Sequence, residues 1–253
     1  MEKYLLLAIF LQGFFMSISW AESKLKIGEK AYVWARNGIW LREEPSIDAK
    51  TVEELAYGTH LKILSDGIGS YKSLAKYGQQ DSTTSYSTTG AWRKVKIEST
   101  HGGNKEGYVF DGWLLSLPPL KCEIKMGVKK RESERSCESI INWGTRSFGL
   151  VNKKKISSGG QGCNGCVTRY LFGKGFIYEE YEPGYGSEDK LTMPGFNLSE
   201  GIIAALGLFA WWDEEKPRIE ISEKRVSFFG TYQRLVVELS KGGVKITDWC
   251  RDC

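Results

Sequence analysis

Short segments in which apolar and polar residues alternate recur between residues 31 and 115, and they restrict the fold more than any other feature of the chain. Alternation with a period of two is typical of a strand with one buried face. The segments with this pattern are residues 39–42, 51–55, 60–64, 92–97 and 107–115. Glycines and Pro45 separate them, and proline lacks the backbone donor that strand pairing needs. Short, evenly spaced strands of this kind predict a closed or sandwiched antiparallel sheet.

Four of these segments also carry a residue pattern that resembles a known family. They read Ile39-Trp-Leu-Arg-Glu-Glu-Pro-Ser46, Val52-Glu-Glu-Leu-Ala-Tyr-Gly58, Trp92-Arg-Lys-Val95 and Gly107-Tyr-Val109, and Leu114 closes the pattern. In this order they resemble the bacterial SH3-like (SH3b) domain, over about a third of the chain. The resemblance implies a small β-barrel in residues 22–116 that binds cell-wall peptide, glycan or another protein. It does not imply catalysis.

The chain departs from the SH3b pattern in three places. Trp40 stands where the family usually has Asn, Glu44 stands where it usually has Gly, and a long polar insertion occupies residues 66–90. These departures lie near the loops that shape a ligand groove, so the ligand preferences of the family do not transfer directly. A polar loop of this length is either a binding element, through its tyrosines, or a mobile decoration.

Aromatic side chains bring a large contact area at low cost in conformational entropy. We therefore predict that Trp40, Tyr57, Trp92 and Tyr108 contact the ligand. The alternative, that Trp92 and Tyr108 belong to the barrel core, stays open. The expected partner is a cell-wall polymer or an extracellular protein.

Residues 1–21 have the composition of a secretory signal peptide. Lys3 precedes an apolar run over residues 4–18, and Ser19-Trp-Ala21 places small residues where a signal peptidase reads. An uncleaved membrane anchor is the alternative, but the run is short for one. We expect a mature chain that begins near Glu22 and is exported to the periplasm or secreted. No later stretch is long and apolar enough to predict a membrane span.

The formal net charge of +4 is mild for 253 residues. An exported chain without an array of stacking aromatics is not expected to bind nucleic acid. The glycines of residues 158–162 lack the Lys-Ser/Thr that a phosphate-binding P-loop requires, and the sequence predicts no cofactor.

Leu117-Pro-Pro-Leu120 predicts a linker between two units, because consecutive prolines stiffen the chain and stop a strand. Residues 121–253 predict a mostly β domain, with a hairpin over residues 170–181. The strands near the end of the chain are expected in residues 218–222, 225–232, 234–239 and 244–249. A short helix is expected after Asn197 or Ser199, either of which is a suitable N-cap. The predicted fold class is therefore mainly β: a barrel followed by a meander with one short helix.

All six cysteines lie in the second half of the chain, and an even number in an exported protein predicts disulfides. They are Cys122, Cys137, Cys163, Cys166, Cys250 and Cys253. We expect a Cys122–Cys137 bond, with Cys163 and Cys166 crossing to Cys250 and Cys253.

Two other interpretations of the cysteines compete with this one. The paired C-x-x-C segments, Cys163–Cys166 and Cys250–Cys253, have the form of a structural zinc site, although their separation is long and an exported compartment is oxidising. The run Trp249-Cys-Arg-Asp-Cys253 superficially resembles a thioredoxin active site. That chemistry needs a helix after the first cysteine, which this sequence does not supply.

The sequence argues against the common cell-wall hydrolases. A cysteine peptidase needs a histidine base and a zinc amidase needs histidine ligands, yet the histidines are only His60 and His101, far in sequence from every cysteine. A glycan hydrolase needs only two carboxylates, and Glu179, Glu180, Glu182 and residues 213–215 supply candidates. We predict a non-enzymatic binding protein, with an envelope glycan hydrolase as the alternative.

Overall fold

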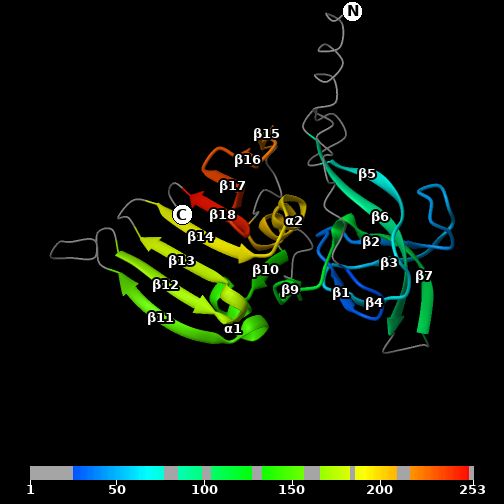
Figure 1. Cartoon of the computed structure of the whole chain (residues 1–253), viewed down its shortest axis with the longest axis horizontal. Coiled ribbons are helices and arrows are strands. Elements are labelled where there is room, and N and C mark those ends of the chain that lie inside the picture. The colour runs from blue at the N-terminus through cyan, green and yellow to red at the C-terminus, as the bar shows by residue number, and fades with distance from the viewer. Residues whose placement is uncertain are drawn as a thin grey trace, which may run out of the picture.

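The computed structural model describes residues 25–76, 85–98, 104–126, 133–156, 166–182, 186–209 and 217–250. Two antiparallel sheets lie side by side, and residues 116–121 connect them (Figure 1). Strands dominate both halves, and the two α-helices of the described residues lie in the second half. The prediction of a mainly β chain is therefore confirmed. No helix in the described part of the chain is long and apolar enough to span a membrane.

The first sheet follows the alternating segments of the sequence. Its strands are β1 (Lys30–Val33), β2 (Ile39–Arg42), β3 (Thr51–Leu55), β4 (His60–Ile63), β5 (Ile68–Lys76), β6 (Ser85–Glu98), β7 (Asn104–Phe110) and β8 (Leu114–Leu115), with a short 3-10 turn η1 (Asp111–Trp113). They pair in the order β3-β2-β7-β6-β4-β1-β8, and β5 pairs with β6. The sheet folds around a core of alternate residues such as Leu41, Val95 and Val109. Among the described strands β3 and β8 do not pair, so the closed barrel that we predicted is not found.

Residues 66–90 are not the loop that the sequence predicts. β5 pairs with β6 from Ile68 opposite Trp92 to Lys76 opposite Ser85, which extends the sheet as a long hairpin. Backbone hydrogen bonds pair β5 with β6 along this length, although the sequence shows no apolar alternation here. Tyr71 is 45 % exposed on it. The residues 77–84 lie outside the described part of the chain.

The second sheet has eight strands, of which the sequence predicts six. They are β11 (Leu150–Ile156), β12 (Cys166–Phe172), β13 (Ile177–Glu182), β14 (Ser187–Pro194), β15 (Arg218–Ser222), β16 (Arg225–Phe229), β17 (Gln233–Ser240) and β18 (Gly243–Cys250). They pair in the order β11-β12-β13-β14-β18-β17-β16-β15. The predicted hairpin is confirmed as β12 and β13 around η2 (Gly173–Gly175), and the four predicted closing strands are confirmed as β15 to β18. β11 was missed because it is a charged edge strand whose residues 150–155 are exposed.

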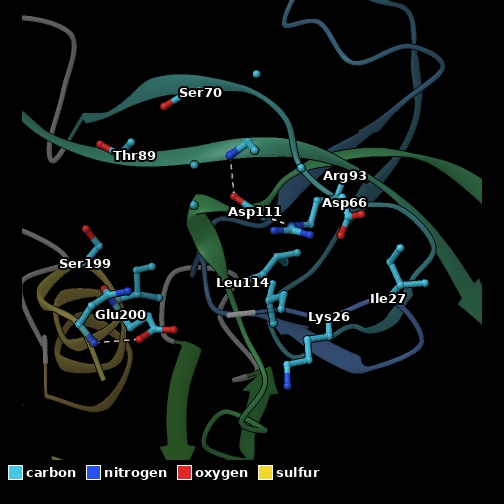
Figure 2. A pocket seen from close by; sticks show the side chains of 18 residues that line it. Lys26, Ile27, Asp66, Ser70, Thr89, Arg93, Asp111, Leu114, Ser199 and Glu200 are labelled. Atoms are coloured by element: carbon cyan, nitrogen blue, oxygen red, sulfur yellow. Dashed lines mark hydrogen bonds and ion pairs between the residues drawn. The ribbon is translucent and has the colours of Figure 1, made fainter. Parts of the chain in front are cut away.

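Helix α2 (Leu198–Leu208) begins where the sequence predicts. Asn197 Oδ1 accepts a hydrogen bond from the Glu200 N–H at 2.9 Å, and Glu200 Oε2 accepts one from the Asn197 N–H at 2.9 Å. This capping box satisfies two of the N–H groups that a helix leaves unpaired at its start. Figure 2 shows this end of the helix, with Glu200 labelled.

Helix α1 (Ile140–Phe148) was not predicted from the sequence. Ser139 is its N-cap, and the Ser139 Oγ accepts a hydrogen bond from the Asn142 N–H at 3.2 Å. Gly149, with φ of 75°, ends the helix in a conformation that favours glycine. The helix was missed because it is only nine residues long.

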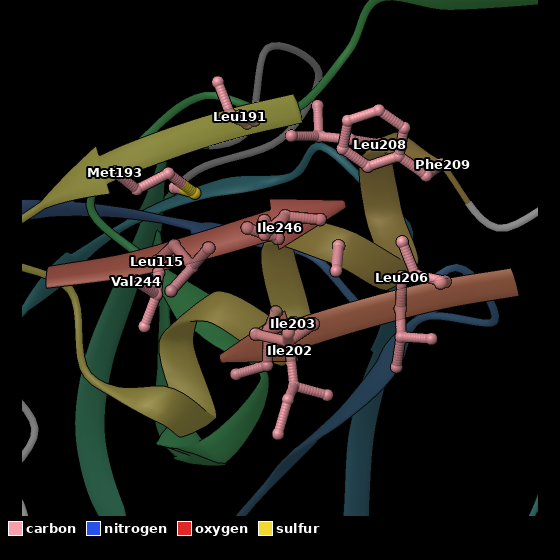
Figure 3. Close-up of a cluster of buried hydrophobic side chains, with 14 of the residues drawn as sticks. Leu115, Leu191, Met193, Ile202, Ile203, Leu206, Leu208, Phe209, Val244 and Ile246 are labelled. Carbon is pink, nitrogen blue, oxygen red and sulfur yellow. The ribbon is translucent and has the colours of Figure 1, made fainter. Parts of the chain in front are cut away.

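Both helices pack on one face of the second sheet. The core between the helices and the sheet includes Leu191, Met193, Ile202, Val244 and Ile246 (Figure 3). Trp34, Leu115 and Leu120, which come from the first half and the connecting segment, are buried in the same cluster. The two halves therefore share part of their core.

The segment Leu117–Leu120 is packed between the sheets. The Trp34 Nε1 donates to the Leu117 carbonyl at 2.7 Å, and the Trp143 Nε1 donates to the Pro118 carbonyl at 2.7 Å. The Arg146 Nη2 donates to the Pro119 carbonyl at 3.0 Å. Leu120 is buried. The predicted linker position is therefore a fixed part of the structure, with three successive carbonyls hydrogen-bonded to side chains from both halves.

A two-stranded hairpin follows this segment. It consists of β9 (Cys122–Met126) and β10 (Ser133–Cys137), and Cys122 lies directly opposite Cys137. The predicted Cys122–Cys137 disulfide is confirmed.

Candidate functional site

A cleft of about 820 Å³ separates β5 and β6 of the first sheet from the N-terminus of α2 (Figure 2). Small hydroxyl side chains line it from both sides: Ser70 and Thr89 from the first sheet, and Ser199 from the helix. Gly90 also lines it, and a Cβ there would lie 2.4 Å from the Gly112 backbone nitrogen. That glycine lets β6 approach η1 closely and shapes the wall of the cleft. Ligand sites often lie between structural units in this way.

A buried ion pair forms the floor of the cleft. The side chains of Arg93 and Asp111 are 7 % and 0 % exposed, and Arg93 Nε lies 2.5 Å from Asp111 Oδ2. Asp111 Oδ1 accepts a hydrogen bond from the Ala91 N–H at 2.7 Å. Because both carboxylate oxygens are engaged, Asp111 holds the sheet together and is not placed to act as a base. Among the described residues that line the cleft there is no cysteine or histidine.

Three of the four predicted binding residues lie on the outer face of the first sheet. Tyr108 is directly opposite Arg42 on β2 and Lys94 on β6. Trp40 lies two residues from Arg42, so it is a diagonal neighbour of Tyr108 on the same face. Trp92 lies two residues from Lys94 and is also on this face. We call the surface formed by Trp40, Arg42, Lys94 and Tyr108 the aromatic face.

Exposure differs sharply between these aromatic residues. Trp40 is 48 % exposed, whereas Trp92 is 7 % exposed and packs edge-on against Phe110, with ring centroids 6.2 Å apart. The alternative that Trp92 is a core residue is therefore supported by its burial. Tyr108 is half-buried. Trp40 is the side chain of the predicted set that offers most of its surface to a ligand.

The structure places Tyr57 apart from the other three. It lies in the turn between β3 and β4, and its ring meets Trp34 edge-on with centroids 6.4 Å apart. It belongs to the contact between the two halves. The sequence did not indicate Arg42 and Lys94 as site residues, because only the pairing of β2, β7 and β6 brings them beside Tyr108.

The two other described cysteines, Cys166 and Cys250, do not lie together. Cys166 is buried on β12, and Cys250 ends β18 and is disulfide-bonded. β13 and β14 separate these strands, which puts the two residues about 14 Å apart at a normal strand spacing. A zinc ion bound by Cys163, Cys166, Cys250 and Cys253 together does not fit this arrangement, because zinc–sulfur bonds are only about 2.3 Å long. Cys163 and Cys253 lie outside the described residues, and the crossed disulfide pairing stays a prediction.

Of the two histidines the structure describes His60, whereas His101 lies outside the described residues. His60 is exposed at the start of β4, and its ring lies 6.4 Å from that of Tyr32.

The carboxylates suggested for glycan hydrolysis do not form a pair. Glu179 lies on the outer face of the second sheet, with Oε1 2.5 Å from Arg169 Nη2. Glu180 points to the opposite face, where its Oε2 accepts a hydrogen bond from the Tyr170 hydroxyl at 3.4 Å. Glu182 has no described side chain, and residues 213–215 lie outside the described part of the chain.

A different set of carboxylates is brought together by the sheet. Glu180, Asp189 and Asp248 occupy one row across β13, β14 and β18. Burial raises the pKa of Asp189 to about 6 and the pKa of Asp248 to about 7. The Gln233 Nε2 donates to Asp248 Oδ1 at 2.7 Å. These residues are far apart in the sequence, and no sequence signal marks them as neighbours.

No family model matches this chain, and no curated protein or solved structure is significantly similar to it. The resemblance to SH3b domains therefore rests on the residues between 31 and 115 alone.

Proposed function

We propose that this chain is an exported, non-catalytic binding protein that holds cell-envelope glycan or its attached peptide on the aromatic face of the first sheet. The observation that carries the proposal is the 48 % exposure of Trp40 beside Arg42 and Tyr108. Exposed tryptophan and tyrosine next to arginine are the residue types that dominate binding surfaces. The SH3b-like residue pattern supports the same class of ligand.

The aromatic face is held in a fixed geometry. The Arg42 Nη1 donates to the Ala49 carbonyl at 2.6 Å, and Lys94 Nζ lies 3.0 Å from Glu106 Oε2. Trp40 stands on a paired strand, opposite Glu54 of β3. A surface whose side chains are already oriented loses less conformational entropy when it binds.

Export is supported by two features that are independent of each other. Residues 1–21 carry the signal-peptide pattern, and the Cys122–Cys137 disulfide is typical of proteins that fold in an oxidising compartment. The proposed location is the periplasm or the extracellular space.

The test is sedimentation with insoluble peptidoglycan sacculi. The chain from Glu22 to Cys253 is expected to pellet with the sacculi, and Trp40→Ala is expected to reduce the bound fraction about ten-fold, because it removes the largest exposed contact. Tyr232→Ala is the matched control, since Tyr232 is a 59 % exposed aromatic residue of the second half. Protein that stays in the supernatant, or equal losses in both variants, contradicts the proposal.

A second candidate function is envelope glycan hydrolysis, and the row of carboxylates favours it. A glycosidase needs one carboxyl group that keeps its proton near neutral pH and a second carboxylate close by. Burial gives Asp248 and Asp189 raised pKa values and the sheet sets them directly opposite each other. Release of soluble fragments from sacculi, lost in Asp248→Asn, would support hydrolysis over binding alone. Intact sacculi after incubation would rule it out.

A further inference from the structure

The outer face of the second sheet has three rows of side chains that run across its strands. The first row contains Glu188, Trp249, Arg234, Phe229 and Arg218, one from each of five neighbouring strands. The middle row consists of small side chains where it crosses β18, β17 and β16, namely Thr247, Val236 and Ser227. The third row contains Lys245, Glu238 and Arg225 on the same three strands.

Small residues between two rows of long ones produce a groove. Its volume is about 410 Å³, and it is lined by Glu188, Trp249 and Arg234 of the first row, Glu238 and Arg225 of the third, and Thr247 and Val236 between them. These residues come from four neighbouring strands, which span about 14 Å at a normal strand spacing. Helix α2 packs on the opposite face of the sheet, where a Cβ at Gly201 would meet Val244 and Val237. The helix therefore does not cover the groove.

Two arginines in the groove are oriented by neutral neighbours. Arg234 Cζ lies 5.0 Å from the centroid of the Phe229 ring, and the Arg225 Nε donates to the Ser227 Oγ at 3.1 Å. Neither guanidinium forms an ion pair with a carboxylate of the described residues. By contrast, Arg218 at the end of the first row is paired with Glu220 at 3.1 Å.

The charges around the groove favour an anion. Glu188 is paired with Lys190, with Nζ and Oε1 2.8 Å apart. Glu238 stands between Lys245 and Arg225 in its row. Arg234 adds a cation next to Trp249. Glu188 thus has a cation of its own, and the four cations Lys190, Lys245, Arg225 and Arg234 outnumber the two carboxylates Glu188 and Glu238, so positive charge remains for a ligand.

We propose that this groove binds an acidic saccharide, a sugar chain whose rings carry carboxylate groups. Arg234 and Arg225 each present a planar fork of donors that matches a carboxylate. Trp249 stands between Arg234 and Glu188 in the first row and is 39 % exposed. Its indole offers a flat apolar surface to the face of a sugar ring. Glu188, Glu238 and Thr247 carry acceptors for the sugar hydroxyls. An acidic saccharide uses all of these groups, whereas an apolar peptide side chain would use only the indole.

This site is separate from the aromatic face and does not depend on it. The two surfaces lie on different sheets, and Trp40 contributes nothing to the groove. The proposal for the groove can therefore be wrong while the proposal for the aromatic face is right, and the reverse.

The test compares two probes that differ in charge only. The chain from Glu22 to Cys253 is titrated with trigalacturonic acid and with its methyl ester, which keeps the sugar rings and loses the negative charges, and binding is measured by calorimetry. We expect the acid to bind at least about ten-fold more tightly than the ester, as the loss of a charge-assisted hydrogen bond predicts. Arg234→Gln and Arg225→Gln are each expected to weaken binding of the acid about ten-fold.

Arg218→Gln is the matched control, because it removes one positive charge from the same face outside the groove. It is expected to change the affinity for the acid by less than about two-fold in physiological salt. Thermal unfolding checks that every variant is folded. Equal affinities for acid and ester, an equal loss in Arg218→Gln, or no binding of the acid at millimolar concentration would each overturn the proposal.

Discussion

The indole of Trp34, which follows the first strand of the chain, fills the space that a side chain at position 207 would need. A Cβ built on Gly207 would lie 2.5 Å from the Trp34 Cε3. Trp34 is 2 % exposed, and its ring also meets Trp143 of α1 edge-on, with centroids 6.4 Å apart. One tryptophan from the first half thus contacts both helices of the second half.

Gly207→Ala is expected to destabilise the protein, although alanine is the better residue for a helix. The intrinsic preference is worth about 1 kcal/mol, and forcing a methyl group into a filled core costs about 1–3 kcal/mol. We expect a net loss of up to about 2 kcal/mol in the free energy of unfolding, measured by urea denaturation. A gain in stability, as expected when alanine replaces glycine in an exposed helix, would show that Trp34 does not need this space.

Asp111→Ala is expected to lower the free energy of unfolding far more than the loss of an exposed ion pair does. The substitution leaves the Arg93 guanidinium buried without a counter-charge and removes the acceptor of the Ala91 N–H. Breaking a buried pair in this way costs about 3–5 kcal/mol.

The comparison variant is Lys50→Ala, whose partner Glu43 is exposed and whose removal should leave the unfolding midpoint unchanged. Replacing Arg93 and Asp111 together by Met and Leu should recover part of the loss. If Asp111→Ala unfolds at the same urea concentration as the parent, the pair does not hold the cleft floor.

Stability is expected to fall as the pH rises from about 4 to about 7. Burial raises the pKa of Asp248 from 3.8 to about 7 in the folded protein. In this window the unfolded chain has released the proton and the folded chain still holds it, so a higher pH favours unfolding.

Asp248→Asn removes this effect and keeps the hydrogen bond from Gln233. We expect the variant to be more stable than the parent at pH 8, by on the order of 2 kcal/mol, with little difference at pH 4. Asp48→Asn, on an exposed turn residue, serves as the control. A parent that is equally stable at pH 4 and pH 8 would contradict the burial of Asp248.

Alternation in the sequence predicts strands well where one face packs on a core. β2, β7 and β17 were found in this way because Leu41, Val109 and Val237 recur at the right period. β5 was missed because residues 66–90 show no apolar alternation, and backbone pairing does not depend on one.

The candidate sites could be predicted only in part, because neighbours on a sheet come from distant segments. Trp40 was identified by its type and by its place in a strand. That Tyr108 lies diagonally across from it depends on β2 pairing with β7. Arg225 and Arg234 lie in strands that the sequence predicts, but only the pairing of those strands shows that a row of small residues separates them.

The three carbonyls of Leu117, Pro118 and Pro119 have a consequence for how the protein unfolds. Each accepts a hydrogen bond from a side chain, and the donors are Trp34 in the first half and Trp143 and Arg146 in the second. A proline-rich connection would ordinarily let two units melt independently. Here the first half cannot open without exposing Trp34 and leaving the Leu117 carbonyl without its donor, so the whole chain should melt in one cooperative transition. A protease aimed at the Pro118–Pro119 segment should therefore cut only after global unfolding.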